Sequence, residues 1–239
     1  MPHLMVPFAN GKGGVGKTTL ACTYAAARAK EGADVLLADA NEQQRTAFEW
    51  SRVREHNGHL PKVRVEIMAA RQAMEQAGRC DVLVIDAPGW TDRNTLALAR
   101  RSTFMVIPTG PNPTYELSAT VRLLHGLKAE GVEAWQMGVV LSRFSEDEPI
   151  RRQEEELARA YLKEAGYVAL DGCLRNSHVY GSALAEGLGL TEISGEERLL
   201  KEASFMMASI EKGVRSADRR HARIEREQGS DRDRGGHQQ

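Results

Sequence analysis

A glycine-rich segment with two lysines is the strongest chemical signal in the sequence. It reads Gly11-Lys12-Gly13-Gly14-Val15-Gly16-Lys17-Thr18 and matches the phosphate-binding pattern G-x-x-x-x-G-K-[ST]. In such a loop, glycines let backbone N–H groups turn toward phosphates, Lys17 can reach the β- and γ-phosphates, and Thr18 can ligate Mg²⁺. A glycine-rich turn without a ligand would leave the charges of both lysines unexplained. We therefore predict a nucleotide site formed by residues 11–18 and the adjoining Thr19.

An acidic residue ends a second apolar run, Val82-Leu83-Val84-Ile85-Asp86. If both runs are parallel strands, they end at the same edge of the sheet, where ligands of open α/β folds bind. Asp86 would then hold the Mg²⁺ shell together with Thr18. Gly89, three residues later, could donate its N–H to the γ-phosphate. A simple turn that ends the strand is the alternative interpretation of Asp86 to Gly89.

Short apolar runs alternate with longer amphipathic stretches, a pattern typical of βαβ units whose parallel strands are buried on both faces. The first helical stretch runs from Gly16 to about Lys30. The sequence therefore predicts an α/β fold, a single P-loop domain with a mostly parallel, twisted sheet of about seven strands and helices on both faces. The expected strands are Leu4–Ala9, Asp34–Ala38, Val63–Met68, Val82–Asp86, Thr103–Pro108, Gln136–Leu141 and Tyr167–Leu170.

The C-terminal segment differs in composition from the rest of the 239 residues. From Gly213 onward, the last 27 residues contain seven arginines, five acids and no aromatic residue. We expect a frayed helix that runs into a disordered tail. The predicted organisation is therefore a P-loop domain over residues 1–212 and a charged tail over residues 213–239.

The overall composition excludes several classes of protein. Apolar residues make up 41% of the chain, and the apolar runs are far shorter than the roughly 20 residues of a membrane span. The N-terminal run leads into the glycine-rich loop, so we expect no export signal and a cytoplasmic protein without membrane partners. Three cysteines without a CxxC pair disfavour a metal cluster. The net charge of −1 means that any nucleic-acid binding would need a local basic patch.

Two further features accompany the phosphate loop. The loop carries an additional lysine, Lys12, and the second expected strand ends in Leu36-Leu37-Ala38-Asp39-Ala40-Asn41. Together with Val-Ile-Asp-Ala-Pro-Gly at residues 84–89, they make the chain resemble the ParA/MinD family of deviant Walker A ATPases. The resemblance is greatest to short, ParF-like members without an N-terminal DNA-binding domain, and it extends over roughly residues 4 to 210.

This resemblance implies a nucleotide-sandwich homodimer that binds ATP and Mg²⁺. Lys12 of each subunit would cross to the phosphates bound by the other and supply the electrostatic stabilisation that other enzymes obtain from an arginine finger. Asp39 matches the acid that positions the attacking water. The family usually has a second Asp followed by Pro two residues later, whereas this chain has Asn41 and Glu42. The implied catalytic residues are therefore Lys12, Lys17 and Asp39.

The resemblance also implies a function in positioning. The expected protein hydrolyses ATP to ADP and phosphate, weakly alone and faster with a ParB-like or other small activating partner. It would position or segregate a plasmid, a chromosome or a large protein assembly through ATP-controlled, non-specific DNA binding, and would be nucleoid-associated. The alternative is a MinD-like or other ParA-type switch that does not act on DNA. A membrane-binding helix would need a bulkier apolar face than the C-terminal segment offers.

Basic residues near the C-terminus are the candidates for DNA contact. Their spacing lets several share one helical face, and a dimer would double whatever weak patch one subunit has. Solvated surface charge, paired with acids such as Glu197, Glu202, Glu211 and Asp218, is the alternative. The candidates are Arg198, Lys201, Lys212, Arg215, Arg219, Arg220 and Arg223.

Overall fold

A six-stranded parallel sheet forms the centre of the computed structural model, which describes residues 3–89 and 93–235. The strand order is β3-β2-β4-β1-β5-β6. All residues of β2, β4, β5 and β6 are buried, because helices cover both faces of the sheet. The strands are β1 Leu4–Phe8, β2 Val35–Asp39, β3 Arg64–Ile67, β4 Val82–Asp86, β5 Met105–Thr109 and β6 Met137–Leu141.

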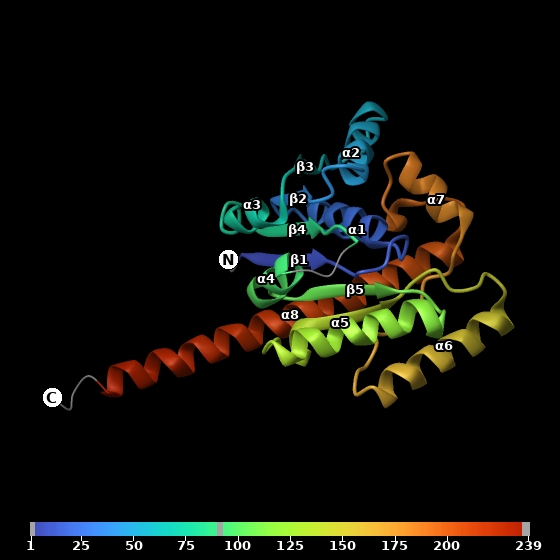
Figure 1. Cartoon of the computed structure of the whole chain (residues 1–239). Helices are drawn as coiled ribbons and strands as arrows, with labels where there is room; N and C mark the ends of the chain where they lie inside the picture. The colour runs from blue at the N-terminus through green and yellow to red at the C-terminus, as the bar shows by residue number, and fades with distance from the viewer. Residues whose placement is uncertain (1–2, 90–92, 236–239) are drawn as a thin grey trace.

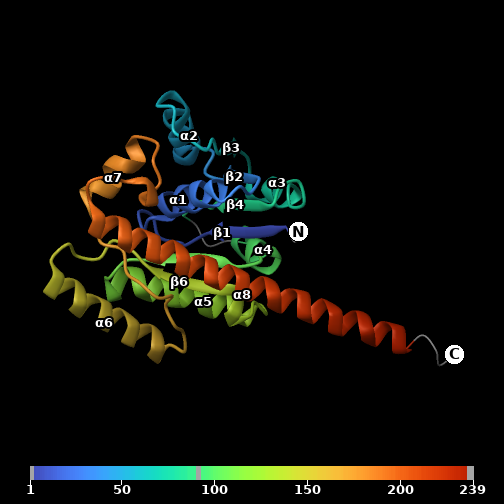
Figure 2. The ribbon, with the colours of Figure 1, turned by 180° about the vertical axis from the view of Figure 1, so that it is seen from behind.

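Two layers of helices enclose the sheet (Figures 1 and 2). One apolar cluster joins one face of the sheet to α3, α4, α5 and α6, and a second joins the other face to α1, α2, α7 and α8. Strand side chains alternate between these layers, so Met5 belongs to the first cluster and Val6 to the second. The helices are α1 Lys17–Lys30, α2 Thr46–His56, α3 Ala70–Glu75, α4 Arg93–Arg101, α5 Ser118–Ala129, α6 Glu148–Glu164, α7 His178–Ala185 and α8 Glu197–Gly235, with short helical turns η1 Pro113–Leu117, η2 Ala134–Gln136 and η3 Leu190–Glu192.

The strand order reverses beside β1. The chain passes from β1 to β2 and β3 on one side, inserts β4 between β2 and β1, and then adds β5 and β6 on the other side. Ligands of open α/β sheets bind at such a switch point, outside the carboxyl ends of the strands. The glycine-rich loop, which joins β1 to α1, lies at this point.

The sheet has six strands among the described residues, so the prediction of a seventh strand at Tyr167–Leu170 is wrong. That segment pairs with β6 only through an isolated bridge between Val139 and Ala169. The Leu170 N–H donates to the Val139 carbonyl at 2.8 Å, after which the chain bends at Asp171. A single pairing interrupted by a bend does not form a ladder. The other six predicted strands are confirmed to within two residues at each end.

Helix α8 is the longest helix and reaches beyond the body of the domain (Figure 1). It continues through Gly213 without interruption, and Val214 and Ala217 are buried, so the first turns after residue 213 pack on the sheet layer. None of the helices in the described ranges has an apolar stretch that would span a bilayer.

A shared carboxylate attaches α8 to α1. Glu211 accepts hydrogen bonds from the Tyr24 hydroxyl at 2.7 Å and from Arg215 Nε at 2.7 Å. Its other contact is Arg28, whose Nη1 lies 3.1 Å from Glu211 Oε1. Tyr24 and Arg28 belong to the helix that follows the glycine-rich loop, so this helix and α8 are joined by one acidic side chain.

A buried arginine joins α2 to the segment around η3. Arg54 is 1% exposed and forms a two-pronged ion pair with Glu192, both N···O distances being 2.7 Å. It also donates to the carbonyls of Pro61 at 3.0 Å and Gly187 at 2.9 Å. Every part of the guanidinium thus has a partner, as a buried charge requires.

Candidate nucleotide site

A cavity of about 750 Å³ opens at the carboxyl edge of the sheet, beside the N-terminus of α1. Its size lies in the range of small-molecule sites. One wall is the glycine-rich loop with the start of α1, a second is the chain after β2, and a third is the chain after β6 with α7. The loop and helix contribute Gly13, Gly14, Gly16, Lys17, Thr18 and Thr19.

The glycine-rich loop has a backbone that side chains would not permit. Gly14 and Gly16 have φ values of 74° and 93°, in the left-handed region. A Cβ on Gly16 would also lie 2.9 Å from the Ser142 hydroxyl. Gly16 directly precedes α1, whose first N–H groups have no partner within the helix. The loop therefore presents the positive end of a helix to the cavity.

Lys17 lies within its own loop, where its Nζ donates to the Lys12 carbonyl at 2.9 Å. It is 8% exposed and lines the cavity. Burial lowers the pKa of Lys17, and the charge of Asp86 opposes this effect. Gly89 lies close by, because a Cβ there would be 3.6 Å from Lys17 Nζ. The structure thus brings Gly89 next to the phosphate loop, and the donation of its N–H to a γ-phosphate stays a prediction.

Thr18 and Asp86 meet at the floor of the cavity. The Thr18 hydroxyl donates to Asp86 Oδ2 at 2.6 Å, while Asp86 Oδ1 is buried and has no hydrogen-bond partner among the described residues. Burial raises the pKa of Asp86 to about 7, and the charge of Asp39 acts in the same direction, whereas the Thr18 hydrogen bond and the charge of Lys17 lower it. A buried carboxylate oxygen without a donor, next to a hydroxyl, suits a hard cation such as Mg²⁺.

The protein groups for such a cation are few. Within residues 3–89 and 93–235, no group of three or more His, Cys, Asp or Glu side chains is arranged to hold a metal ion. Mg²⁺ characteristically takes one or two protein ligands, with the remainder supplied by phosphate and water. Thr18 and Asp86 therefore fit a metal that arrives with a nucleotide.

Asp39 lies beside Asp86 in the register of β2 and β4, but it is not among the residues that line the cavity. It is fully buried, and its two oxygens accept the N–H groups of Asn41 and Phe48, each at 3.1 Å. The donors come from the chain after β2 and from α2. Asn41 is the nearest residue along the chain that lines the cavity.

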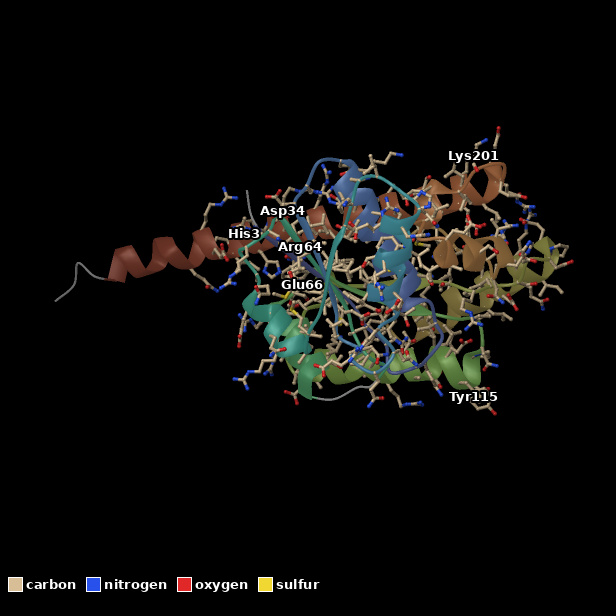
Figure 3. All side chains as sticks on the ribbon, turned by 90° about the horizontal axis from the view of Figure 1, so that it is seen from above. His3, Asp34, Arg64, Glu66, Tyr115 and Lys201 are labelled. Carbon is tan, nitrogen blue, oxygen red and sulfur yellow. The ribbon has the colours of Figure 1, made fainter. Side chains whose placement is uncertain are left out.

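Lys12 faces away from the cavity. Its Nζ lies 6.0 Å from the centre of the Tyr115 ring on η1, and it lines a second cavity of about 580 Å³ between α4 and α5, as does Gly11. Tyr115 is 64% exposed and projects from the surface of the domain (Figure 3). Val15 is 1% exposed and anchors the loop in the core. The side chains of Lys12 and Lys17 thus point to opposite sides of one loop.

The wall after β6 contains residues that are not among the predicted site residues, although the sequence leaves open whether Arg143 flanks the base or caps a surface helix. Arg143 has a φ of 65° and donates through Nη1 to the Gly14 carbonyl and through Nε to Asn176 Oδ1 at 3.4 Å. Ser177 and Tyr180 also line the cavity. The only sequence signal was the position of Arg143 directly after a predicted strand, because Asn176 follows 33 residues later along the chain.

The seven basic candidates all lie exposed on α8, and helical geometry puts them within an arc of about 140°, opposite the buried stripe. Five pair with acids, and Arg220 instead lies over the Trp135 ring at 5.1 Å. Lys201 projects into solvent in Figure 3. The five pairs are Arg198–Glu148, Lys201–Glu197, Lys212–Asp171, Arg215–Glu211 and Arg223–Glu227.

A parallel sheet with a phosphate loop after its first strand, and a Thr–Asp pair at the same edge, defines a P-loop nucleotide-binding domain. The model of the family described as "CobQ/CobB/MinD/ParA nucleotide binding domain" matches residues 6–188. The chain belongs to this family, which confirms the resemblance inferred from the sequence.

Individual relatives agree with this assignment. Maintenance of carboxysome distribution protein A from Gloeobacter kilaueensis is 28% identical over 217 residues, which cover 87% of this chain and 93% of the relative. The septum site-determining protein MinD from Pyrococcus horikoshii, solved with Mg-ADP, has a TM-score of 0.68 at 18% identity and covers 88% of this chain and 96% of its own. An ATP complex of McdA from Cyanothece has a TM-score of 0.66 at 17% identity, with coverages of 91% and 97%.

Proposed function

We propose that this chain is a dimerising ATPase that positions or segregates a cargo through ATP-controlled, non-specific DNA binding. The proposal rests on the directions of the two lysine side chains in the phosphate loop. Lys17 faces the cavity together with Thr18 and Asp86, while Lys12 faces outward. Relatives named for carboxysome distribution, septum-site determination and plasmid partition support a positioning function.

ATP would bind with its phosphates against the loop. Lys17 would exchange the Lys12 carbonyl for the β- and γ-phosphates, and the N–H groups at the start of α1 would donate to phosphate oxygens. Thr18 and Asp86 would hold Mg²⁺, which neutralises part of the triphosphate charge. Arg143, held by Gly14 and Asn176, would close the nucleotide side of the cavity.

Asp39 would orient the attacking water. Its two N–H donors keep the carboxylate at the carboxyl end of β2, one strand away from Asp86. To reach water in the cavity, the carboxylate would have to give up the N–H of Asn41 or Phe48. We propose that this exchange accompanies ATP binding.

Lys12 would complete the site of a second subunit. Because Lys12 faces outward from the phosphate loop, its ammonium can reach across a subunit interface. Lys17 would still neutralise part of the charge on the phosphates bound by the same subunit. In the homodimer, Lys12 of each subunit would then contact the nucleotide of the other.

A small activating protein, ParB-like or other, would stimulate hydrolysis in this homodimer.

The basic face of α8 would hold DNA and so place the protein on the nucleoid. Exposed ion pairs contribute little stability, so phosphates can replace the acids that pair with these arginines and lysines. The same pairs favour the second candidate, a ParA-type regulatory switch that does not act on DNA, because they leave little uncompensated charge on the helix.

DNA retention distinguishes the two candidates. Replacing Arg215, Arg219 and Arg220 by Ala should reduce the slope of log affinity against log salt by up to about 3 for each subunit that contacts DNA, or about 5 for the dimer, since each phosphate contact contributes about 0.9. ATP hydrolysis in the absence of DNA should not change.

A matched control removes the same charge elsewhere. Arg64, Arg71 and Arg79 are exposed and lie on or near β3 and α3, away from α8. Their replacement by Ala should leave the slope unchanged. Absence of ATP-dependent DNA retention at low salt by the wild-type protein would refute DNA positioning and favour the switch.

A further inference from the structure

A buried asparagine lies directly before the phosphate loop and has no role in the site described so far. Asn10 is 1% exposed. Its Oδ1 accepts the Lys12 N–H at 3.0 Å, and its Nδ2 donates to the Pro108 carbonyl at 2.7 Å and to the Thr120 hydroxyl at 2.9 Å. One side chain therefore connects the loop to the end of β5 and to α5.

The chain of hydrogen bonds continues beyond Asn10. The Thr120 hydroxyl donates to the Thr109 hydroxyl at 3.0 Å, and both threonines are fully buried. Each hydroxyl proton in this series has an acceptor, so the direction of donation runs from Asn10 through Thr120 to Thr109. Buried networks with complete pairing fix the positions of their members, because a lost partner leaves a desolvated polar group.

The Lys12 peptide is held on both sides. Its N–H donates to Asn10, and its carbonyl accepts Lys17 Nζ at 2.9 Å. Under the proposed function, the contact with Lys17 is given up when phosphates bind. Asn10 then remains as the group that fixes the Lys12 backbone, while the Lys12 ammonium lies 6.0 Å from the centre of the Tyr115 ring.

We propose that Asn10 is a positioning residue for Lys12, and that Thr120 on α5 controls it through their shared hydrogen bond. This inference rests on the proposed function of Lys12 across a dimer. Neither Asn10 nor Thr120 lines the nucleotide cavity, so they would act on Lys12 without contacting the nucleotide.

Hydrogen exchange of the Lys12 amide, measured by NMR in the nucleotide-free protein, tests the geometry. Asn10→Ala should speed exchange of this amide by about fivefold, the equivalent of one hydrogen bond of about 1 kcal/mol. Thr120→Val should act in the same direction, whereas Thr120→Ser, which keeps the hydroxyl, should not. Unchanged exchange in both Asn10→Ala and Thr120→Val would overturn the inference.

A double-mutant cycle tests the functional part. Asn10→Ala should weaken ATP-driven association about five- to tenfold while changing nucleotide affinity less than threefold. In a Lys12→Ala background, the same change should have no further effect, because Asn10 acts through Lys12. If Asn10→Ala weakens association equally in the wild-type and Lys12→Ala backgrounds, or weakens nucleotide binding as much as association, then Asn10 only stabilises the fold. Either result would overturn the inference.

Two controls keep the outcomes separate. If Asn10→Ala does not fold, Thr120→Val and Thr120→Ser carry the same comparison with a nearly isosteric change. If the wild-type protein does not associate with ATP, the proposed function fails. Hydrogen exchange does not depend on association, so it still decides whether Asn10 and Thr120 hold Lys12.

Discussion

Replacing Asp86 by Asn should stabilise the nucleotide-free protein at neutral and alkaline pH. Burial raises the pKa of this carboxyl from 3.8 to about 7. The folded protein therefore binds the proton more tightly than the unfolded chain does, and the contribution of Asp86 to stability falls as pH rises from about 4 to about 7. Above that range, the fold contains an ionised carboxylate, one oxygen of which has no hydrogen-bond donor within the described part of the chain.

The magnitude follows from the shift. About three pKa units at roughly 1.4 kcal/mol each give an upper bound of about 4 kcal/mol at pH 8. An amide carries no charge to desolvate, so Asp86→Asn should gain part of this amount at pH 8 and show no such gain below pH 4. Urea denaturation across this pH range, without nucleotide or Mg²⁺, measures the difference in the free energy of unfolding.

The control is an exposed carboxylate on the edge strand. Glu66 on β3 is exposed, its side chain 52% accessible, and Glu66→Gln should keep the pH dependence of the wild-type protein. If Asp86→Asn and the wild-type protein lose stability in parallel between pH 4 and pH 7, the buried carboxylate is not the cause. Asp86 would then not be a cation ligand whose charge is left unpaired in the nucleotide-free protein.

Four further predictions concern the site and the core. Lys17→Ala should abolish ATP binding in a fluorescent-nucleotide titration, because the phosphates lose their nearest cation; wild-type affinity would contradict the assignment. Asp39→Ala should bind ATP yet hydrolyse it poorly and accumulate as a dimer by light scattering, whereas normal turnover would place water orientation elsewhere. Gly16→Ala should weaken nucleotide binding at least tenfold, since φ is positive and a Cβ would meet Ser142; equal affinity would show that the loop adapts. Arg54→Met should lower the free energy of unfolding by about 3 to 5 kcal/mol in urea, because Glu192 would be left buried without its partner, and a loss below 1 kcal/mol would refute that role.

The parts of the site predicted from sequence are those encoded by neighbouring residues. The loop from Gly11 to Thr18 has a local pattern, and Asp86 follows four apolar residues that can only be a buried strand in this context. Their meeting follows from the parallel sheet, since strands that end together bring their last residues together. The Thr18–Asp86 contact was therefore predictable from the sequence.

Long-range contacts were not predictable in the same way. Asn10 forms hydrogen bonds with Pro108 and Thr120, which are 98 and 110 residues away along the chain, and hydrophobic periodicity does not predict such contacts. Asp39 was identified by resemblance, but its hydrogen bonds depend on how α2 is placed after β2. The expected strand at Tyr167–Leu170 has strand-like composition, yet the bend that follows it leaves room for a single pairing only.

Glu211 limits how freely the parts of this molecule can be exchanged. Its carboxylate is shared by Tyr24 and Arg28 on α1 and by Arg215 on α8. A chimera that took its C-terminal helix from a relative would bring a new residue to this position while keeping the native α1. Such a helix should fit only if an acid is supplied at the same turn, or if the tyrosine and arginine of α1 are exchanged with it. Helix α8 is therefore a poor choice as a module to exchange between relatives, even though its C-terminal turns extend beyond the body of the domain.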